Sequence, residues 1–251
     1  MLGVLPSFLA RLLFYVNGQA SGFWRYLLQD AVLALCGWVP GVVGLMIRAT
    51  AYRLILHTDG FVLVEPGVRL RHAGNIRLGR GVLLSSGVYI HACAQGVEVG
   101  DDSVLMRGVE LHTFNFRDLP HAFVRIGRRC IVGSRVVIRG QGGVSIGDDV
   151  VIEPGAQLIA AQHNFGDTSR PVSDQYITAT GIAVGDGVLI GARAIVLDGV
   201  CVGSGAVIGV GAVVTRDVPS RCYAAGVPAS VVRRFPASED DPAPQRYAAA
   251  G

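Results

Sequence analysis

Residues 182–214 read IAVGDGVLIGARAIVLDGVCVGSGAVIGVGAVV, and this stretch decides the fold. One aliphatic residue returns every six positions, and glycine follows most of them. These positions are Val184, Ile190, Val196, Val202, Ile208 and Val214. An amphipathic helix would show a period of 3.6 residues, which this stretch lacks. The six-residue period instead predicts short strands wrapped around a narrow apolar interior.

The same period extends back along the chain to Leu78. The earlier positions are Leu78, Leu84, Ile90, Val99, Leu105, Leu111, Ile126, Val132, Ile138, Ile146, Ile152 and Leu158. The step exceeds six residues only after every third hexad, at 90–99, 111–126, 138–146 and 158–184. Three hexads therefore form one coil of a triangular prism, and every insertion leaves at the same corner. Six clear coils and a weaker one around Val64 and Leu70 predict a prism roughly 30 Å long.

Residues 1–57 form a separate apolar segment that is rich in helix formers. The run from Ala31 to Ile47 carries no charge, but Pro40-Gly41 interrupts it, so we expect two short helices and not a membrane span. One interpretation packs these helices on the main domain or at an oligomer interface. The other lays them against the inner face of the membrane, with arginines near anionic lipid. Residues 58–235 carry the repeat, and residues 236–251 are expected to form a flexible polar tail.

Composition narrows the range of partners and locations. The net charge is only +3, which gives no reason to expect nucleic acid as a partner. Five cysteines without a C-x-x-C spacing argue against a zinc site or a disulfide framework, and they favour a reducing compartment. The N-terminus lacks the features of a secretory signal, so we expect a cytoplasmic protein.

Three segments resemble a known family. They are Ala-Gln-His-Asn-Phe at 161–165 with Ser-Arg-Pro-Val-Ser-Asp-Gln at 169–175, Gly-Val-Gly-Ala-Val-Val-Thr-Arg-Asp-Val-Pro at 209–219, and Ala-Gly-Val-Pro-Ala at 225–229. With the repeat, they resemble the hexapeptide-repeat acyltransferases, and most closely the polysaccharide and sugar O-acetyltransferases. The resemblance implies a left-handed parallel β-helix and a homotrimer. It also implies an O-acyltransferase that moves an acetyl group from acetyl-CoA to a hydroxyl of a sugar, polysaccharide precursor or glycolipid.

His163 is the candidate general base. A hydroxyl that attacks a thioester must lose its proton, and histidine suits this task because its pKa lies near neutrality. His163 directly precedes the longest insertion, residues 164–183, and the family segment matches on both sides of it. Asp167, Asp174 or a backbone carbonyl could orient the imidazole.

Polar or unusually small residues at the insertion corner are candidates for acceptor binding. Asn115, Gly142 and Gln162 occupy positions where a small inward residue is expected, which suggests a wall that faces a cleft. Local turn hydrogen bonding explains Asn115 equally well. We therefore expect Asn115, Gln162 and Asp174 to contact the acceptor.

The acyl-CoA contacts follow from the resemblance alone. It implies contacts at Ala192, Val210, Thr215, Arg216 and Arg233 in a groove between two subunits. Arg216 and Arg233 would face the nucleotide phosphates, which a guanidinium binds well.

Two other functions remain open at this point. The first is an acyltransferase that takes its acyl group from acyl carrier protein. The second is a non-catalytic or metal-binding prism similar to the γ-carbonic anhydrases, which would need three histidines across a subunit interface. His91 and His112 occupy equivalent places in their coils and are expected to form an outward column that is exposed or lies at a subunit contact. His57, His72 and His121 have no motif context, and no metal is expected.

Overall fold

The chain begins with a helical segment. The computed structural model describes residues 8–93, 95–113, 119 and 121–236. Helices α1 (Phe8–Asn17), α2 (Phe23–Cys36) and α3 (Gly41–Ala51) are followed by the short 3-10 helix η1 (Tyr52–Leu54). Pro40 is the N-cap of α3, which confirms the expected break. Among the described residues, no helix is long and apolar enough to cross a membrane.

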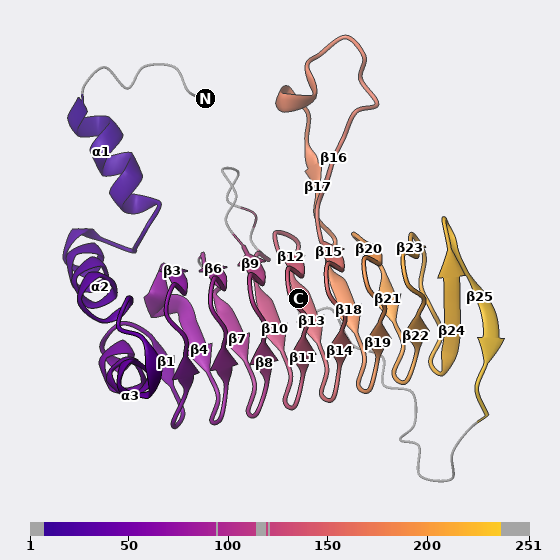
Figure 1. The fold of residues 1–251 in the computed structure, drawn as a ribbon. Coiled ribbons are helices and arrows are strands. Elements are labelled where there is room, and N and C mark those ends of the chain that lie inside the picture. Colours follow the sequence, from indigo (N-terminus) through magenta and orange to yellow (C-terminus); the bar gives the residue numbers. More distant parts are fainter. Residues whose placement is uncertain (1–7, 94, 114–118, 120, 237–251) are drawn as a thin grey trace.

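Three parallel sheets form the rest of the fold (Figure 1). The first contains β1 (His57–Thr58), β4 (Ile76–Leu78), β7 (Val97–Val99), β10 (Val124–Ile126), β13 (Val144–Ile146), β18 (Ile182–Val184) and β21 (Cys201–Val202). The second contains β2 (Leu63–Val64), β5 (Leu83–Leu84), β8 (Val104–Leu105), β11 (Ile131–Val132), β14 (Val151–Ile152), β19 (Leu189–Ile190) and β22 (Val207–Ile208), and ends with β24 (Cys222–Gly226) and the antiparallel β25 (Ala229–Arg234). The third contains β3 (Arg69–Arg71), β6 (Tyr89–His91), β9 (Glu110–His112), β12 (Val137–Arg139), β15 (Gln157–Ile159), β20 (Ile195–Leu197) and β23 (Val213–Val214).

The chain visits the three sheets in turn, so each set of three strands is one coil. Seven coils stack in the described part of the chain, which confirms the six clear coils and the weaker one around Val64 and Leu70. The architecture is a left-handed parallel β-helix preceded by helices, as the sequence predicts.

The periodic aliphatic residues form the core of the prism. Leu84 pairs with Leu105, and Leu105 pairs with Val132, so equivalent hexad positions lie directly above one another. All three side chains are fully buried. Burial of each such side chain contributes about 1.5–3 kcal/mol. A shift of one residue would turn these side chains outward, so the six-residue period fixes the register.

Carboxylates and glycines make the turns between strands possible. An Asp101 oxygen accepts the Arg80 backbone N–H of the preceding coil at 2.8 Å, and Asp148 accepts the N–H of Arg128 at 2.8 Å in the same way. These bonds satisfy backbone donors that no strand partner reaches. A Cβ at Gly100 would lie 2.7 Å from the carbonyl carbon of Gly127, so only glycine allows the coils to stack closely here.

Helices α2 and α3 cover the open end of the first coil. Val32 and Tyr52 belong to the same buried cluster as Val64 of β2. The fully buried Arg48 donates hydrogen bonds to the carbonyl oxygens of Val64 (2.6 Å), Val39 (2.6 Å) and Cys36 (3.1 Å). Helices α2 and α3 therefore pack on the main domain through this face.

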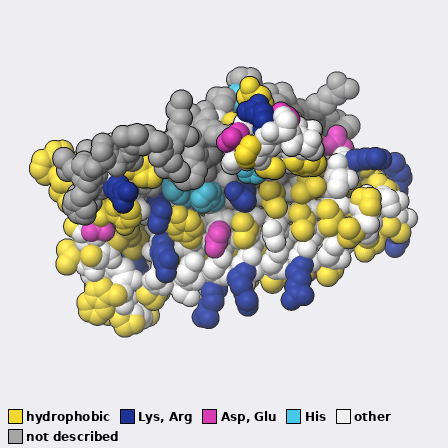
Figure 2. Space-filling model, turned by 90° about the horizontal axis from the view of Figure 1, so that it is seen from above, with side chains coloured by type: hydrophobic (Ala, Val, Ile, Leu, Met, Phe, Trp, Pro, Cys, Tyr) yellow, Lys and Arg dark blue, Asp and Glu magenta, His cyan; other side chains and the backbone are white. Residues whose placement is uncertain are grey.

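The opposite face of the helices is exposed. Trp24 and Trp38 are 80% and 71% exposed, and they lie among other exposed apolar side chains. These are Phe23, Leu27, Leu28, Leu35, Val42, Val43, Met46 and Leu54. Figure 2 shows hydrophobic side chains at the helical end of the molecule and arginines spaced along one side of the prism. We call Trp24, Trp38 and the eight apolar residues named with them the helical apolar face.

All four long insertions leave at the corner between the third and first sheets, as expected. The longest forms an arm that stands away from the prism (Figure 1). Its base is β16 (Gln162–His163) paired antiparallel with β17 (Ile177–Thr178), and the short 3-10 helix η3 (Val172–Asp174) lies near its tip. A second short 3-10 helix, η2 (Ala73–Asn75), follows β3 at the same corner.

Candidate active site

His163 lies at the base of the arm. It ends β16, and its register partner on β17 is Ile177. Two further hydrogen bonds hold the arm together just beyond it: Asn164 N–H donates to the Tyr176 carbonyl at 2.9 Å, and Thr178 Oγ1 donates to Asn164 Oδ1 at 2.9 Å. The side chain of His163 is exposed, so an acceptor can reach the imidazole.

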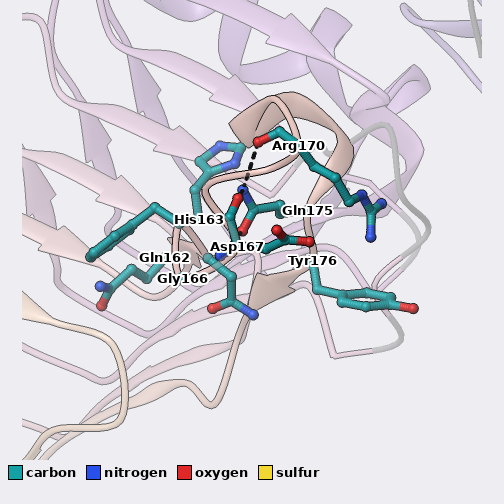
Figure 3. A pocket seen from close by; sticks show the side chains of 9 residues that line it. Gln162, His163, Gly166, Asp167, Arg170, Gln175 and Tyr176 are labelled. Carbon is teal, nitrogen blue, oxygen red and sulfur yellow. Dashed lines mark hydrogen bonds between the residues drawn. The ribbon is translucent and has the colours of Figure 1, made fainter.

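An open cleft of about 510 Å³ surrounds the imidazole (Figure 3). Its lining residues are Gln162, His163, Asn164, Phe165, Gly166, Asp167, Arg170, Gln175 and Tyr176. Gln162, an expected acceptor contact, therefore lines the cleft. Asp174 lies in η3 and does not line it, and Asn115 lies outside the described residues. Gly142 is buried in the prism and forms no part of the cleft wall.

Gln175 organises the arm, and sequence reasoning missed it. Its side chain is buried although the surrounding arm is exposed. Gln175 Nε2 donates to the carbonyl oxygens of Asp167 (2.8 Å) and Arg170 (3.1 Å), and its Oε1 accepts the Asp167 N–H at 3.2 Å. The segment 169–175 was noticed for its resemblance, but a single loop amide has no period or spacing that reveals such a role.

The two carboxylates that could orient His163 have other partners. Asp167 accepts hydrogen bonds from the hydroxyl and the backbone N–H of Ser169, and these bonds lower the pKa of its carboxyl group. Asp174 accepts a 3.3 Å bond from Ser173. Within the described residues of one chain, no hydrogen bond or ion pair to the His163 imidazole is present. The pairing of β16 with β17 is what positions His163 here.

Two of the residues expected to contact acyl-CoA lie together. Ala192 and Val210 occupy the corner between the second and third sheets in successive coils, and the Gly211 N–H donates to the Ala192 carbonyl at 2.9 Å. The Ala192 N–H already donates to Glu153 at 2.8 Å. Both backbone groups of Ala192 are therefore occupied, which leaves its small side chain to adjoin a ligand. Val210 is highly exposed.

The other three residues expected to contact acyl-CoA lie elsewhere on the last coils. Thr215 and Arg216 follow β23 at the insertion corner, and Arg233 lies on β25 with its guanidinium 5.5 Å from the centre of the Phe235 ring. All three are exposed. None of the five expected contacts lines the cleft at His163 among the described residues, so one chain does not join the two regions.

The histidine column exists, but it is not exposed as expected. His91 and His112 are register partners on β6 and β9, with ring centres 5.2 Å apart. His72, which had no motif context, stacks on His91 at 5.7 Å. His91 is only 3% exposed, and burial first, then His112 and His72, lowers the pKa of its imidazole to about 3. The exposure expectation is wrong for His91 because a neighbouring coil and the chain near Gly18 close over it.

Known proteins share both the repeat and the fold. A family model described as "Hexapeptide repeat of succinyl-transferase" matches residues 123–159 and 181–216. The probable acetyltransferase Rv3034c of Mycobacterium tuberculosis is 30% identical over 167 residues, which are 66% of this chain and 54% of that protein. The galactoside O-acetyltransferase of Escherichia coli is 34% identical over 112 residues, 45% of this chain and 54% of that protein.

A solved structure supports the architecture. AntD, an N-acyltransferase from Bacillus cereus crystallised with dTDP and 3-hydroxybutyryl-CoA, has a TM-score of 0.51 at 17% identity, covering 72% of this chain and 85% of that one. At this identity the likeness concerns the fold alone. The chain spans about half the length of the two curated relatives. The repeat, the coiled sheets and these relatives together support the hexapeptide-repeat acyltransferase family for this chain.

Proposed function

We propose that the protein is an acetyl-CoA-dependent O-acetyltransferase in which His163 is the general base. The observation that carries the proposal is the exposed His163 imidazole in an open cleft, on an arm whose tip Gln175 holds in place. The acceptor hydroxyl oxygen attacks the thioester carbonyl carbon while the imidazole removes the hydroxyl proton. The carbon–sulfur bond then breaks, the imidazolium returns its proton to the sulfur, and CoA leaves as the thiol. General base catalysis of this kind contributes about 10²- to 10⁴-fold.

The cleft suits a sugar acceptor. Phe165 and Tyr176 line it and are both largely exposed, so their planar apolar faces can pack on a sugar ring. Gln162 adds an amide that can donate to and accept from hydroxyl groups. The related galactoside O-acetyltransferase carries a galactoside in its name. We assign the acceptor to sugars, polysaccharide precursors or glycolipids on this basis.

We further propose a trimer that holds acetyl-CoA between neighbouring prisms. The outer side of the third sheet near the arm presents four apolar side chains in register: Ile195 and Val213 form one row, which continues to the polar Gln157, and Ile159 and Leu197 form the next. Outward aliphatic residues on a sheet are expected to be covered by a second surface. A neighbouring chain there would bring its cofactor residues (Ala192, Val210, Thr215, Arg216 and Arg233) toward this cleft. Residues 58–235 would then form the catalytic domain.

We propose that the helical apolar face contacts the inner face of the cytoplasmic membrane, where a lipid-linked acceptor would be presented. Its two exposed tryptophans, Trp24 and Trp38, are typical of membrane–water interfaces. Arg11, Arg25 and Arg53 are exposed basic residues nearby in the sequence, and they would favour anionic lipid.

The test is acetyl transfer by the purified full chain. We would supply acetyl-CoA labelled in the acetyl group with a panel of β-galactosides, other hexosides and amino sugars. The proposal expects label in a product that mild alkali releases, because esters are cleaved under conditions that leave amides intact. Label found only in alkali-stable products would identify an N-acyltransferase. Transfer that occurs only from acyl carrier protein would favour the alternative donor.

A further inference from the structure

Three metal-binding side chains meet beside the first two coils, away from the acyl-transfer cleft. His72 follows β3, His91 ends β6, and Cys93 lies two residues further on. Their donor atoms, one imidazole nitrogen from each histidine and the Cys93 sulfur, all lie within 4.8 Å of one another. The three residues span two coils and follow no C-x-x-C pattern, so no sequence motif predicts this cluster.

The backbone holds the three donors in place. The His72 N–H donates to the Gln19 carbonyl at 2.6 Å, which ties this histidine to the chain between α1 and α2. On the other side, the fully buried Thr113 accepts the Cys93 N–H at 2.7 Å and donates its hydroxyl to the His91 carbonyl at 3.0 Å. Donors fixed in this way lose little conformational freedom when they bind an ion.

His72 provides a second, independent observation. Its imidazole lies within hydrogen-bonding range of the Asn17 and Gly18 backbone, but its buried Nε2 makes no hydrogen bond of good geometry among the residues the structure describes. A buried imidazole nitrogen without a partner is costly, and a metal ion would satisfy it.

We propose that His72, His91 and Cys93 bind a zinc ion. Two imidazoles and a thiolate suit zinc, whereas magnesium and calcium prefer oxygen ligands. Zinc–nitrogen and zinc–sulfur bonds of about 2.0–2.3 Å require the donors to approach by about 1 Å, which side-chain rotation supplies. Binding releases the Cys93 thiol proton to solvent, and a water molecule takes the fourth position. The thiolate offsets part of the ion's charge, while the neighbouring Arg71 opposes it.

The ion would join parts of the chain that lie far apart in sequence. The His72 backbone is hydrogen-bonded to Gln19, and His91 and Cys93 belong to the second coil. A zinc ion at this place would fasten the segment between α1 and α2 to the β-helix. Because the ion lies on β3 and β6 and not on the arm, acyl transfer at His163 is not its role.

The experiment is metal titration of the full chain under reducing conditions, after removal of bound metal with a chelator. Zinc should bind saturably at one ion per chain, measured by competition with a chromogenic chelator. Cobalt should give d–d bands and a thiolate-to-cobalt charge-transfer band. Cys93→Ser should abolish the charge-transfer band, and His72→Gln should weaken zinc binding by at least about tenfold.

Matched controls are Cys201→Ser and His57→Gln, which change an exposed thiol and an exposed imidazole elsewhere. Both should bind zinc and cobalt as the unchanged chain does. Since His91 is buried and its replacement risks misfolding, Cys93→Ser and His72→Gln decide the matter. Absence of saturable zinc binding, or binding unchanged in both of these variants, would overturn the proposal. A site that binds only copper(I) would overturn the assignment to zinc.

Discussion

Replacement of Gln175 by alanine should loosen the arm while leaving the prism intact. The substitution removes three hydrogen bonds: two donated by Nε2 to the carbonyls of Asp167 and Arg170, and one accepted from the Asp167 N–H. A neutral hydrogen bond contributes about 0.5–1.5 kcal/mol, so the loss amounts to about 2–4 kcal/mol of local stability. Because Gln175 is not part of the core cluster, the melting temperature of the β-helix should not change.

Hydrogen exchange measures this local effect directly. Amides of residues 164–178 should exchange about 30- to 1000-fold faster in Gln175→Ala, since 1.4 kcal/mol corresponds to a factor of ten. Amides of the prism strands should keep their rates, and kcat should fall because His163 loses a fixed position. Ser173→Ala is the control, since this exposed residue lies on the same arm. Unchanged exchange rates of residues 164–178 in Gln175→Ala would refute the role of Gln175 in holding the arm together.

Three further changes test other parts of the molecule. Arg48→Met should lower the free energy of unfolding in urea by about 3–5 kcal/mol, because it leaves the buried carbonyl of Val64 and the part-buried carbonyls of Cys36 and Val39 without their donor; a loss below 1 kcal/mol would contradict the role of Arg48 in fastening the helices. The double change Trp24→Ala and Trp38→Ala should weaken binding to vesicles of phosphatidylcholine and phosphatidylglycerol, measured by co-sedimentation, at least about tenfold. Equal binding by the double variant and the unchanged chain would contradict the proposed membrane contact. Leu197→Glu should shift the mass measured by light scattering from trimer toward monomer, and an unchanged trimer would move the interface off the third sheet.

The β-helix could be predicted from sequence because its signal repeats. Each coil repeats the same two features, an inward aliphatic residue every six positions and a longer step after every third hexad. A pattern repeated over this many coils does not arise by chance. Residues such as Leu105 and Val132 follow this rule and lie in the core. The first coil was weaker because β1 carries Thr58 at the position where the next coil carries the aliphatic Leu78.

The site was harder to predict because its features come from single residues. His163 was found through a matched segment, and its position in a cleft agrees with a role in catalysis without testing it. Gln175, His72 and Arg48 were not found, since each acts through hydrogen bonds to the backbone that no periodic pattern records: Gln175 within its own loop, and His72 and Arg48 with segments elsewhere in the chain. The prediction that His91 is exposed was wrong because the segment near Gly18 that helps to bury this side chain is over 70 residues away in the sequence.

The measurement that tests the central claim most directly is acetyl transfer by His163→Ala. With the acceptor found for the unchanged chain, kcat should fall by about 10²- to 10⁴-fold, the usual contribution of a general base. Acetyl-CoA affinity, measured by calorimetry, should be nearly unchanged, because the imidazole acts on the acceptor oxygen. His121→Ala is the matched control, since it removes an exposed imidazole outside the cleft and should retain full activity. A His163→Ala chain that turns over at the rate of the unchanged chain would remove His163 from the mechanism.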